Sequence, residues 1–310
     1  MRPVSARAPA KINLQLAVGA QRPDGFHEVA TAYHAISLYD QVIAQPADAL
    51  TVSVSGTSGV PAGDVPLDTD NIAAAAVIAL AKRVGRPPGV HLHITKGIPV
   101  AGGMAGGSAD AAATLVACDA LWQTGLPRKE LTRLAAGLGS DVPFALVGST
   151  ALGTGRGEVL TPVLARGRFS WVVAIAEGGL STPAVYAECD RLRAADRLRA
   201  AVRIRAPAVS AELMAALRAG DPEALGKAMR NDLQEAALNL QPSLRQTLHT
   251  AHKAGALGAI VSGSGPTVVM LARGPEHAID IAVALSATGT CRAVKRAHGP
   301  VPGARLLGET

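Results

Sequence analysis

Aromatic side chains are scarce in this sequence. Phenylalanine, tryptophan and tyrosine make up 3% of the 310 residues, although 48% of the residues are hydrophobic and 17% are charged. The core must therefore be packed with alanine, valine and leucine. Because nucleic-acid binders stack bases on aromatic rings, the shortage argues against nucleic acid as a partner, despite a formal net charge of +6. An anionic small molecule suits this modest positive charge equally well.

Cysteines and long apolar runs are also few. Cys118, Cys189 and Cys291 lie far apart and show neither C-x-x-C nor Cys/His metal spacing, so no disulfide framework and no zinc site is predicted. The first residues lack the continuous apolar core of a signal peptide, and no later segment has about 18 uncharged apolar residues in a row. We therefore expect a cytoplasmic protein that does not enter a membrane.

The order of predicted strands and helices indicates two α+β domains. A chain of this length exceeds the size at which one hydrophobic core usually keeps growing, and the polar, glycine-rich residues 153–168 are typical of a boundary. We divide the chain into residues 1–164 and 165–310. Hydrophobic periodicity and capping signals predict strands at 11–18, 28–38, 50–55, 90–95, 169–176, 258–262 and 267–272, and helices at 72–85, 109–122, 127–138, 183–195, 209–218, 221–237 and 242–254. The Arg- and Ala-rich residues 190–205 predict a solvated helix or a mobile insertion.

The segment from Pro99 to Ser108, PVAGGMAGGS, has the composition of a phosphate-binding loop. Its glycines lie between a predicted strand and a predicted helix, where backbone amides and the helix dipole attract an anion. The segment matches neither GxxxxGK[ST] nor the dinucleotide GxGxxG spacing. A tight turn beside a closely packed helix would explain one or two of the glycines but hardly all of them. Ser108 is placed to cap the helix or to contact phosphate or Mg²⁺.

Three ordered motifs resemble the superfamily of galactokinase, homoserine kinase, mevalonate kinase and phosphomevalonate kinase. The glycine segment is similar to its P-x-x-x-G-L/M-G-G-S-A/S motif, while APAKINLQL at 8–16 and IVSGSGPTVVML at 260–271 resemble the flanking motifs. The resemblance implies an α+β, two-domain small-molecule kinase with its active site in the cleft between the domains. Residues 1–164 would form the ATP-binding and catalytic domain, and residues 165–310 the substrate-side domain.

Within this superfamily, PAKINLQLAVGAQRPDGFHEV resembles the amino-terminal segment of the 4-diphosphocytidyl-2-C-methyl-D-erythritol kinases. That family has the pattern K-x-N-L-x-L followed by R-x-D-G-Y/F-H, and LGSDVPF, GTGRGE and STPAVY are also similar to it. The resemblance implies phosphorylation by ATP of the 2-hydroxyl of the cytidine diphosphate-linked methylerythritol, in the non-mevalonate pathway of isoprenoid precursor synthesis. Another superfamily kinase, such as a homoserine kinase, and a catalytically silent nucleotide or RNA binder remain as alternatives.

Lys11 and Asp141 are the predicted catalytic residues. Lys11 lies in an apolar alternating segment, where a bare ammonium would be costly without an anionic partner, and Asp141 is the natural candidate. The resemblance implies that Asp141 accepts or orients the proton of the acceptor hydroxyl, and that Lys11 keeps Asp141 ionised. A structural ion pair, a lysine at a strand edge and an aspartate in a helix-terminal turn are the alternatives.

The DGFH turn is predicted to recognise the cytosine. Phe26 offers a ring for stacking and His27 an imidazole for hydrogen bonds, and Tyr33 and Tyr186 would bracket the base or its ribose. A hairpin turn with a core phenylalanine is the alternative. The resemblance gives the predicted substrate-binding residues as Asn13, Phe26, His27, Tyr33, Thr182 and Tyr186.

The predicted nucleotide-binding residues surround the glycine segment. Asn71 is either an adenine-side residue or an ordinary helix N-cap, and Lys96 either reaches the nucleotide or is an exposed lysine at a strand end. The full set is Asn71, Lys96, Pro99, Val100, Ala101, Gly102, Gly103, Met104, Ala105, Gly106, Gly107, Ser108 and Ala109. The cofactors expected are ATP and Mg²⁺, the latter held mainly by phosphate oxygens and water. Arg156 is a ligand-side cation or a turn residue, and SGSGPT at 262–267 is expected to form a wall of the site.

Overall fold

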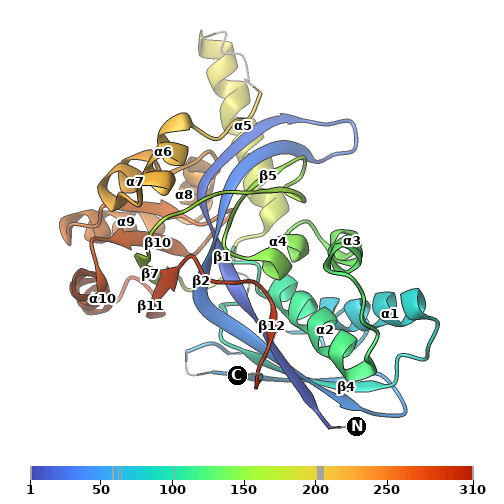
Figure 1. Ribbon diagram of the computed structural model, residues 1–310. Helices are drawn as coiled ribbons and strands as arrows, with labels where there is room; N and C mark the ends of the chain where they lie inside the picture. Colours follow the sequence, from blue (N-terminus) through green and yellow to red (C-terminus); the bar gives the residue numbers. More distant parts are fainter. Residues whose placement is uncertain are drawn as a thin grey trace.

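Two long antiparallel strands form the spine of the protein (Figure 1). The computed structural model describes residues 2–57, 59–61, 63, 65–100, 102–200 and 206–308, with the side chains of 196–200 left aside. Strands β1 (Val4–Gln21) and β2 (His27–Pro46) pair from Val4–Ala44 to Gln21–His27. They belong to a sheet with the order β12-β1-β2-β4-β3, which β5, β6 and β8 extend. The remaining strands of this first sheet are β3 (Thr51–Gly56), β4 (Val90–Lys96), β5 (Thr150–Thr154), β6 (Val159–Pro162), β8 (Arg230–Asn231) and β12 (Arg305–Leu306).

Both long strands extend well beyond the predicted strands at 11–18 and 28–38. Each one pairs with different partners along its length: β1 with β12 and β8, and β2 with β4 and β5. A register shift between Pro9 and Ala10 accommodates the proline within β1. The extra length therefore depends on partners that are remote in sequence.

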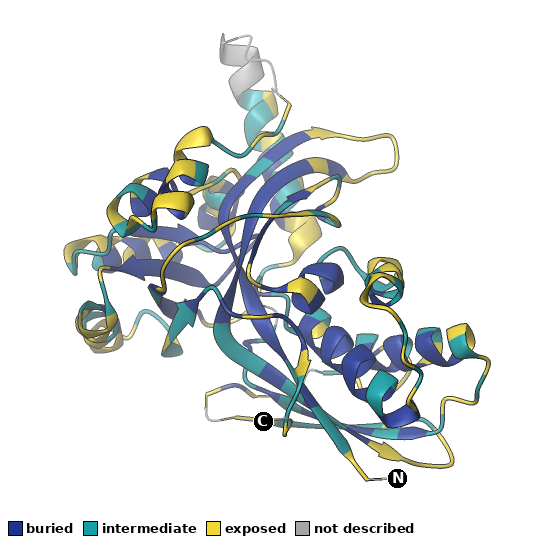
Figure 2. Cartoon of the chain, in the orientation of Figure 1, coloured by how far each residue is buried: buried dark blue, intermediate teal, exposed yellow. Residues whose placement is uncertain are grey.

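Four helices lie beside the long strands. Helix α2 packs on β1 and β2, and the other three helices pack on α2. Helix α2 is buried along nearly its whole length, which Figure 2 shows as a dark blue helix between the strands and its neighbours. Its run of alanines permits this close packing. The helix begins at Gly106, three residues before the prediction, because Gly106, Gly107 and Ser108 form its first turn. The four helices are α1 (Ile72–Val84), α2 (Gly106–Trp122), α3 (Arg128–Leu138) and α4 (Val142–Val147).

The second half of the chain builds a four-stranded antiparallel sheet with the order β11-β7-β10-β9. Its strands are β7 (Phe169–Ile175), β9 (Gly258–Val261), β10 (Val268–Ala272) and β11 (Ala293–Gly299). Its helices are α5 (Thr182–Ala200), α6 (Ala211–Ala219), α7 (Pro222–Ala228), α8 (Gln234–Leu240), α9 (Leu244–Lys253) and α10 (Pro275–Thr288). Mixed helix and sheet in both halves confirms the α+β prediction. Across the described ranges, none of the helices has the length and apolar character needed to cross a membrane.

The predicted single helix at 221–237 is wrong. Helices α7 and α8 are separated by β8, which pairs in parallel with β1 at Gln15 and Leu16. The Asn231 side chain causes the break, because its amide donates to the carbonyls of Val261 and Gly263 while its oxygen accepts from the Leu233 amide. Strand β6 lies in the region predicted to be a linker, and α10 and β11 were not predicted.

The chain passes from the first sheet to the second between β6 and β7. Its last described strand, β12, returns to pair with β1 at Ala6 and Arg7. Residues on both sides of 165 therefore contribute to the first sheet. The division into 1–164 and 165–310 stays a prediction.

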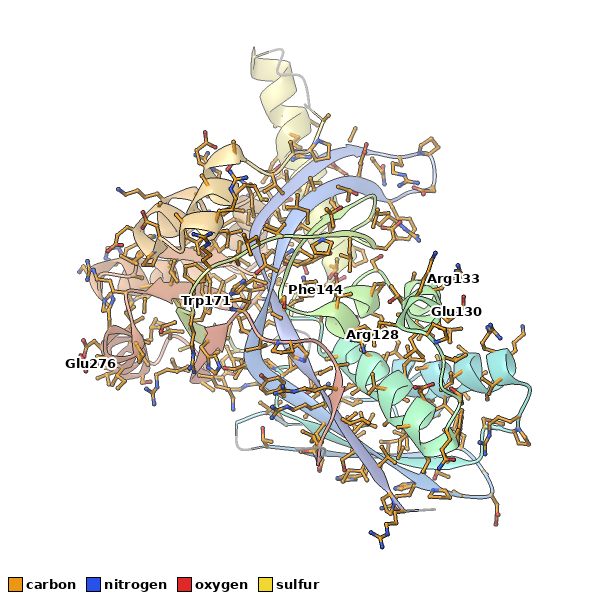
Figure 3. The ribbon with its side chains drawn as sticks, viewed as in Figure 1. Arg128, Glu130, Arg133, Phe144, Trp171 and Glu276 are labelled. Atoms are coloured by element: carbon orange, nitrogen blue, oxygen red, sulfur yellow. The ribbon has the colours of Figure 1, made fainter. Side chains whose placement is uncertain are left out.

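His34 joins the two sheets. It is fully buried on β2, its Nδ1 lies 2.9 Å from the Thr150 hydroxyl, and its ring meets Phe169 and Trp171 of β7 edge-on. Figure 3 labels Trp171 at this junction. Burial lowers the pKa of His34 to about 3, because an imidazolium would lose its hydration there.

We predict that His34 makes the fold acid-sensitive. The folded state keeps His34 neutral, whereas the unfolded chain takes up a proton below pH ~6.5, so stability is complete above that pH and falls by up to about 1.4 kcal/mol per pH unit towards pH 3. Urea unfolding of the wild type and of His34→Asn between pH 7.5 and 5 measures this. The variant should be less stable at pH 7.5 but should lose less on acidification. Equal losses in both proteins would contradict the prediction.

Candidate active site

Two cavities meet at the glycine loop. The larger cavity, about 880 Å³, is lined by β1, the start of β2, the start of α4, the first turns of α5 and the SGSGPT segment. The smaller cavity, about 340 Å³, is lined by residues 65–66 and 70–72, by Lys96 and Asp110, and by the loop itself. Gly103 and Ala105 line both. Two ligands bound in these cavities would therefore meet at these two residues.

The glycine loop is held against the SGSGPT segment at Gly103. The backbone of Gly103 has a φ of +70°, and a Cβ atom at this position would overlap the carbonyl oxygen of Ser262. Ala105, also left-handed, is the N-cap of α2 and provides no side-chain cap. In the described structure, no N-cap side chain binds the first backbone amides of α2. These amides can therefore donate to an anionic ligand, as an anion site requires.

The structure distributes the predicted loop residues over both cavities. Ser108 does not cap α2 and instead faces the larger cavity. Met104 and Ala109 are buried, and the Met104 carbonyl accepts from the Lys11 amide at 3.2 Å. Ala101 lies outside the described residues. The predicted loop residues that line the smaller cavity are Pro99, Val100, Gly102, Gly103, Ala105, Gly106 and Gly107.

Lys11 and Asp141 form the predicted ion pair. The Lys11 Nζ lies 3.6 Å from Asp141 Oδ2 and donates to Asn13 Oδ1 at 2.8 Å. Asn13 in turn donates to the Thr31 hydroxyl at 2.7 Å. Lys11 is 8% exposed, so the alternative of a lysine at an exposed strand edge is wrong. Asp141 directly precedes α4, and its side chain is 28% exposed towards the cavity.

Tyr33 lies beside Asp141. Its hydroxyl donates to Asp141 Oδ1 at 2.9 Å, and its ring packs on Phe144, the α4 residue labelled in Figure 3. Burial, followed by the nearby Asp141 carboxylate, raises the pKa of Tyr33 well above its ordinary value. Tyr33 therefore stays protonated and acts as a hydrogen-bond donor to Asp141.

The far end of the larger cavity contains the DGFH turn. His27 is buried, its ring packs against Tyr186 with centroids 4.9 Å apart, and its Nε2 lies 2.9 Å from Asp190. Phe26 is 52% exposed and carries the Arg156 guanidinium 4.7 Å above its ring. The alternative of a core phenylalanine is therefore wrong.

Thr182, Arg156 and the SGSGPT segment, all of them predicted at the site, also lie around the larger cavity. Thr182, at the start of α5, shares a hydrogen bond of 2.9 Å with Ser264 of the SGSGPT segment. Gly263 in that segment approaches Asn13 and Lys11 closely, and with Ser264 it forms a wall of the cavity as expected. Arg156 is both a turn residue and a cation that lines the cavity.

Asn71 is the N-cap of α1. Its Oδ1 accepts from the Ala73 amide at 2.8 Å, and its Nδ2 donates to the Pro66 carbonyl at 2.7 Å. The N-cap interpretation is thus confirmed, while Asn71 also lines the smaller cavity. Contact with the nucleotide stays a prediction.

Lys96 is buried beneath the glycine loop, so the interpretation as an exposed lysine is wrong. Its Nζ donates to Asp110 Oδ2 at 2.5 Å and also to Asp40 Oδ2. Asp40 Oδ1 accepts from the amides of Gly97 and Ile98, whereas Asp110 Oδ1 is buried without a partner among the described residues. Burial and the neighbouring Asp40 charge raise the pKa of Asp110 well above its ordinary value.

Sequence reasoning missed several of these residues. Asp110 had a signal, since it is an acidic residue within an alanine-rich helix and so implies a buried partner. Asp40 lies beyond the predicted end of its strand. Asp190 lies on a helix rich in charged residues, where nothing marks it in the sequence.

We predict that Asp110→Asn leaves the fold nearly intact, because burial and the Asp40 charge raise the pKa of Asp110 and so favour its neutral form. A carboxyl with a raised native pKa stabilises the fold fully below pH ~4 and loses that contribution as the pH rises, so the variant should show less decline of stability between pH 4 and 7 than the wild type. Asp40→Asn, which leaves Lys96 facing an amide, should cost about 3–5 kcal/mol. Urea unfolding measures both. Equal costs for the two variants at pH 7 would contradict this assignment.

Comparisons with known proteins agree with this geometry. The family model of the GHMP kinases N terminal domain matches residues 71–149, and that of the GHMP kinases C terminal matches residues 213–291. A 4-diphosphocytidyl-2-C-methyl-D-erythritol kinase of Salinispora tropica is 56% identical over 306 residues, 98% of this chain and 94% of the relative. The kinase of the same name from Streptomyces avermitilis is 56% identical over 304 residues, 98% of this chain and 99% of the relative.

Solved structures share the fold. A crystal structure of a 4-(cytidine 5'-diphospho)-2C-methyl-D-erythritol kinase superposes with a TM-score of 0.75 at 31% identity, covering 98% of this chain and 99% of that chain. The homoserine kinase of Cytophaga hutchinsonii superposes with a TM-score of 0.73 at 18% identity, covering 99% of this chain and 98% of its own. This second likeness concerns the fold alone.

Proposed function

Because the chain belongs to the GHMP kinases, and within them to the 4-diphosphocytidyl-2-C-methyl-D-erythritol kinases, we propose that its smaller cavity binds ATP and its larger cavity the cytidine-bearing acceptor. The protein is an ATP-dependent small-molecule kinase of isoprenoid precursor synthesis. It transfers the γ-phosphoryl group of ATP to the 2-hydroxyl of 4-diphosphocytidyl-2-C-methyl-D-erythritol, which yields the 2-phosphate and ADP. One observation carries the proposal: both cavities reach Gly103 and Ala105, beside Lys11 and Asp141.

Asp141 is the group that receives or orients the hydroxyl proton. Phosphoryl transfer needs mainly alignment and neutralisation of charge on the transferring oxygens. Tyr33 occupies Asp141 Oδ1, so Oδ2, 3.6 Å from the Lys11 ammonium, is the oxygen available to the acceptor. Lys11 favours the ionised carboxylate and stabilises the alkoxide character that develops on the attacking oxygen.

The amides at the start of α2 hold the phosphate chain. Gly106 and Gly107 line the smaller cavity and Ser108 the larger one, so the helix terminus reaches both ligands. The positive end of the helix dipole favours the phosphate charge there. The same amides thus align the γ-phosphoryl group with the acceptor hydroxyl.

A Mg²⁺ ion fits at the start of α2, beside the proposed phosphate site. A magnesium ion bound with a nucleotide takes most of its ligands from phosphate oxygens and water and needs few from the protein. The Ser108 hydroxyl and the Asp141 carboxylate are oxygen donors that line one cavity, and Ser108 would hold the ion. Bound there, Mg²⁺ would neutralise charge on the phosphate oxygens.

The DGFH end of the larger cavity binds the cytidine diphosphate. His27 and Tyr186 offer a polar edge and a ring face, while the exposed Phe26 offers a second ring. Arg156 provides a cation for the diphosphate. The cytoplasmic location, and the exclusion of nucleic acid as a partner, stay predictions.

We predict that only the cytidine-bearing acceptor accelerates ADP release. A coupled assay with 4-diphosphocytidyl-2-C-methyl-D-erythritol and with homoserine as separate acceptors measures this. Homoserine would leave the DGFH end of the cavity empty and lose its binding energy. Faster ADP release with homoserine alone would overturn the proposed substrate.

We predict that Asp141→Asn keeps ATP binding and loses most turnover, about 10²- to 10⁴-fold in kcat. The amide cannot take the proton, although it preserves the shape of the site. Calorimetry with ATP and the coupled assay measure the two effects. Asp280→Asn, an exposed residue on α10, is the charge-matched control. Unchanged turnover in the Asp141 variant would remove this residue from the mechanism.

A further inference from the structure

Two residues of α5 hold the His27 ring, one turn apart. Tyr186 packs on its face, with an interplanar angle of 36°, and Asp190 meets its Nε2 edge. Both carboxylate oxygens of Asp190 lie within hydrogen-bond distance of Nε2, at 2.9 and 3.1 Å. The His27 side chain is 5% exposed and that of Asp190 is 38% exposed. The orientation of the imidazole is thus fixed by α5, although Asp190 lies 163 residues after His27 in the sequence.

The contact determines where the proton of a neutral His27 lies. An ionised carboxylate only accepts hydrogen bonds, so the hydrogen between the two groups must be on Nε2. The other nitrogen, Nδ1, then carries a lone pair and is an acceptor. Nδ1 makes no hydrogen bond with any residue that the structure describes, and His27 lines the larger cavity.

An acceptor at this position distinguishes cytosine from uracil. Cytosine presents an exocyclic amine at its 4-position, which donates to Nδ1, whereas uracil presents a carbonyl oxygen, which Nδ1 repels. With the opposite tautomer the preference would reverse. Which base is bound therefore depends on the hydrogen-bond partner of Nε2, the ring nitrogen that does not contact the base.

We propose that Asp190 is a positioning residue for base specificity, which fixes His27 in the Nε2–H tautomer so that the site accepts cytidine and rejects uridine nucleotides. The proposal rests on the proposed function and assigns a role to a residue that does not touch the reacting atoms. Asp190, which also lines the larger cavity, acts through its contact with His27. Its loss should therefore affect recognition of the base and leave the transfer step intact.

The variant Asp190→Asn tests the proposal with two acceptors, the cytidine diphosphate-linked methylerythritol and its uridine counterpart. The asparagine can either accept from or donate to Nε2, so His27 loses its fixed tautomer. We expect the ratio of kcat/KM for the cytidine over the uridine acceptor to fall about ten- to a hundredfold. The kcat with saturating cytidine acceptor should stay within about twofold of the wild type, because Lys11 and Asp141 are untouched.

Glu188→Gln is the matched control. It removes one negative charge from the same helix, but Glu188 contacts Arg191 and Asn239 and not His27. The control should keep the wild-type ratio. A ratio unchanged in Asp190→Asn, or lowered equally in both variants, would overturn the proposal.

Nitrogen-15 NMR of histidine-labelled wild-type protein tests the tautomer without any variant. We expect the His27 Nδ1 resonance at the position of an unprotonated nitrogen and the Nε2 resonance at that of a protonated one, and averaged shifts in Asp190→Asn. A protonated Nδ1 in the neutral His27 of the wild-type protein would overturn the proposal. This result would count even if the variant does not fold. If the wild type phosphorylates neither nucleotide-linked acceptor while the tautomer is as expected, the proposed function fails and the assignment of the proton stands.

Discussion

The close packing at Gly103 is the contact on which the geometry of the site depends. No side chain fits there, because the carbonyl of Ser262 and the backbone of Gly265 occupy the space that a Cβ would need. The contact joins the loop that begins α2 to a segment of the second sheet, and so brings the walls of the larger cavity together. On the other side of the loop, the Met104 carbonyl accepts from Lys11, which ties the loop to β1 as well. The start of α2, the catalytic pair and the second half of the chain are therefore fixed by one short loop.

Two buried lysines stand on either side of this loop, and each is stabilised differently. The Lys96 ammonium donates to two buried carboxyl groups, so its own charge is satisfied, although Asp110 Oδ1 has no partner among the described residues, and the cluster reaches a ligand only at the smaller cavity. Lys11 has a single carboxylate partner at 3.6 Å, and that carboxylate remains partly exposed. A buried charge that is fully satisfied contributes to structure, whereas one that is incompletely satisfied has free energy left for a ligand. This difference, more than the burial of the lysines, separates the structural cluster from the reactive one.

The sequence allowed the chemistry to be predicted better than the architecture that supports it. The need of Lys11 for an anionic partner followed from the cost of burying an ammonium, the choice of Asp141 from the family resemblance, and the capping role of Asn71 from its place before an alanine-rich helix. The extent of β1 and β2 did not follow, because their outer parts pair with strands that are remote in sequence. The break in the helix at 221–237 depends on hydrogen bonds from Asn231 to carbonyls more than 25 residues away. Asp190 lies on the charged helix α5. Only the packing of α5 against the cavity decides which face of this helix points toward the site.

The pairing of β1 with β2 also sets the distance between base recognition and chemistry. Asn13 pairs with Tyr33 beside the catalytic residues, and Gln21 pairs with His27 at the other end. Tyr33 and His27 are six residues apart on β2, so the two ends of the site are separated by at most about 20 Å at ~3.3 Å per residue. A ligand that engages both ends must span from the base to the reacting hydroxyl within this limit, as a nucleoside diphosphate linker can and a small amino acid cannot. A slip of one residue between the two strands would turn the side chains of one strand to the opposite face. The register between β1 and β2 therefore determines both the recognition of the base and the placement of the hydroxyl.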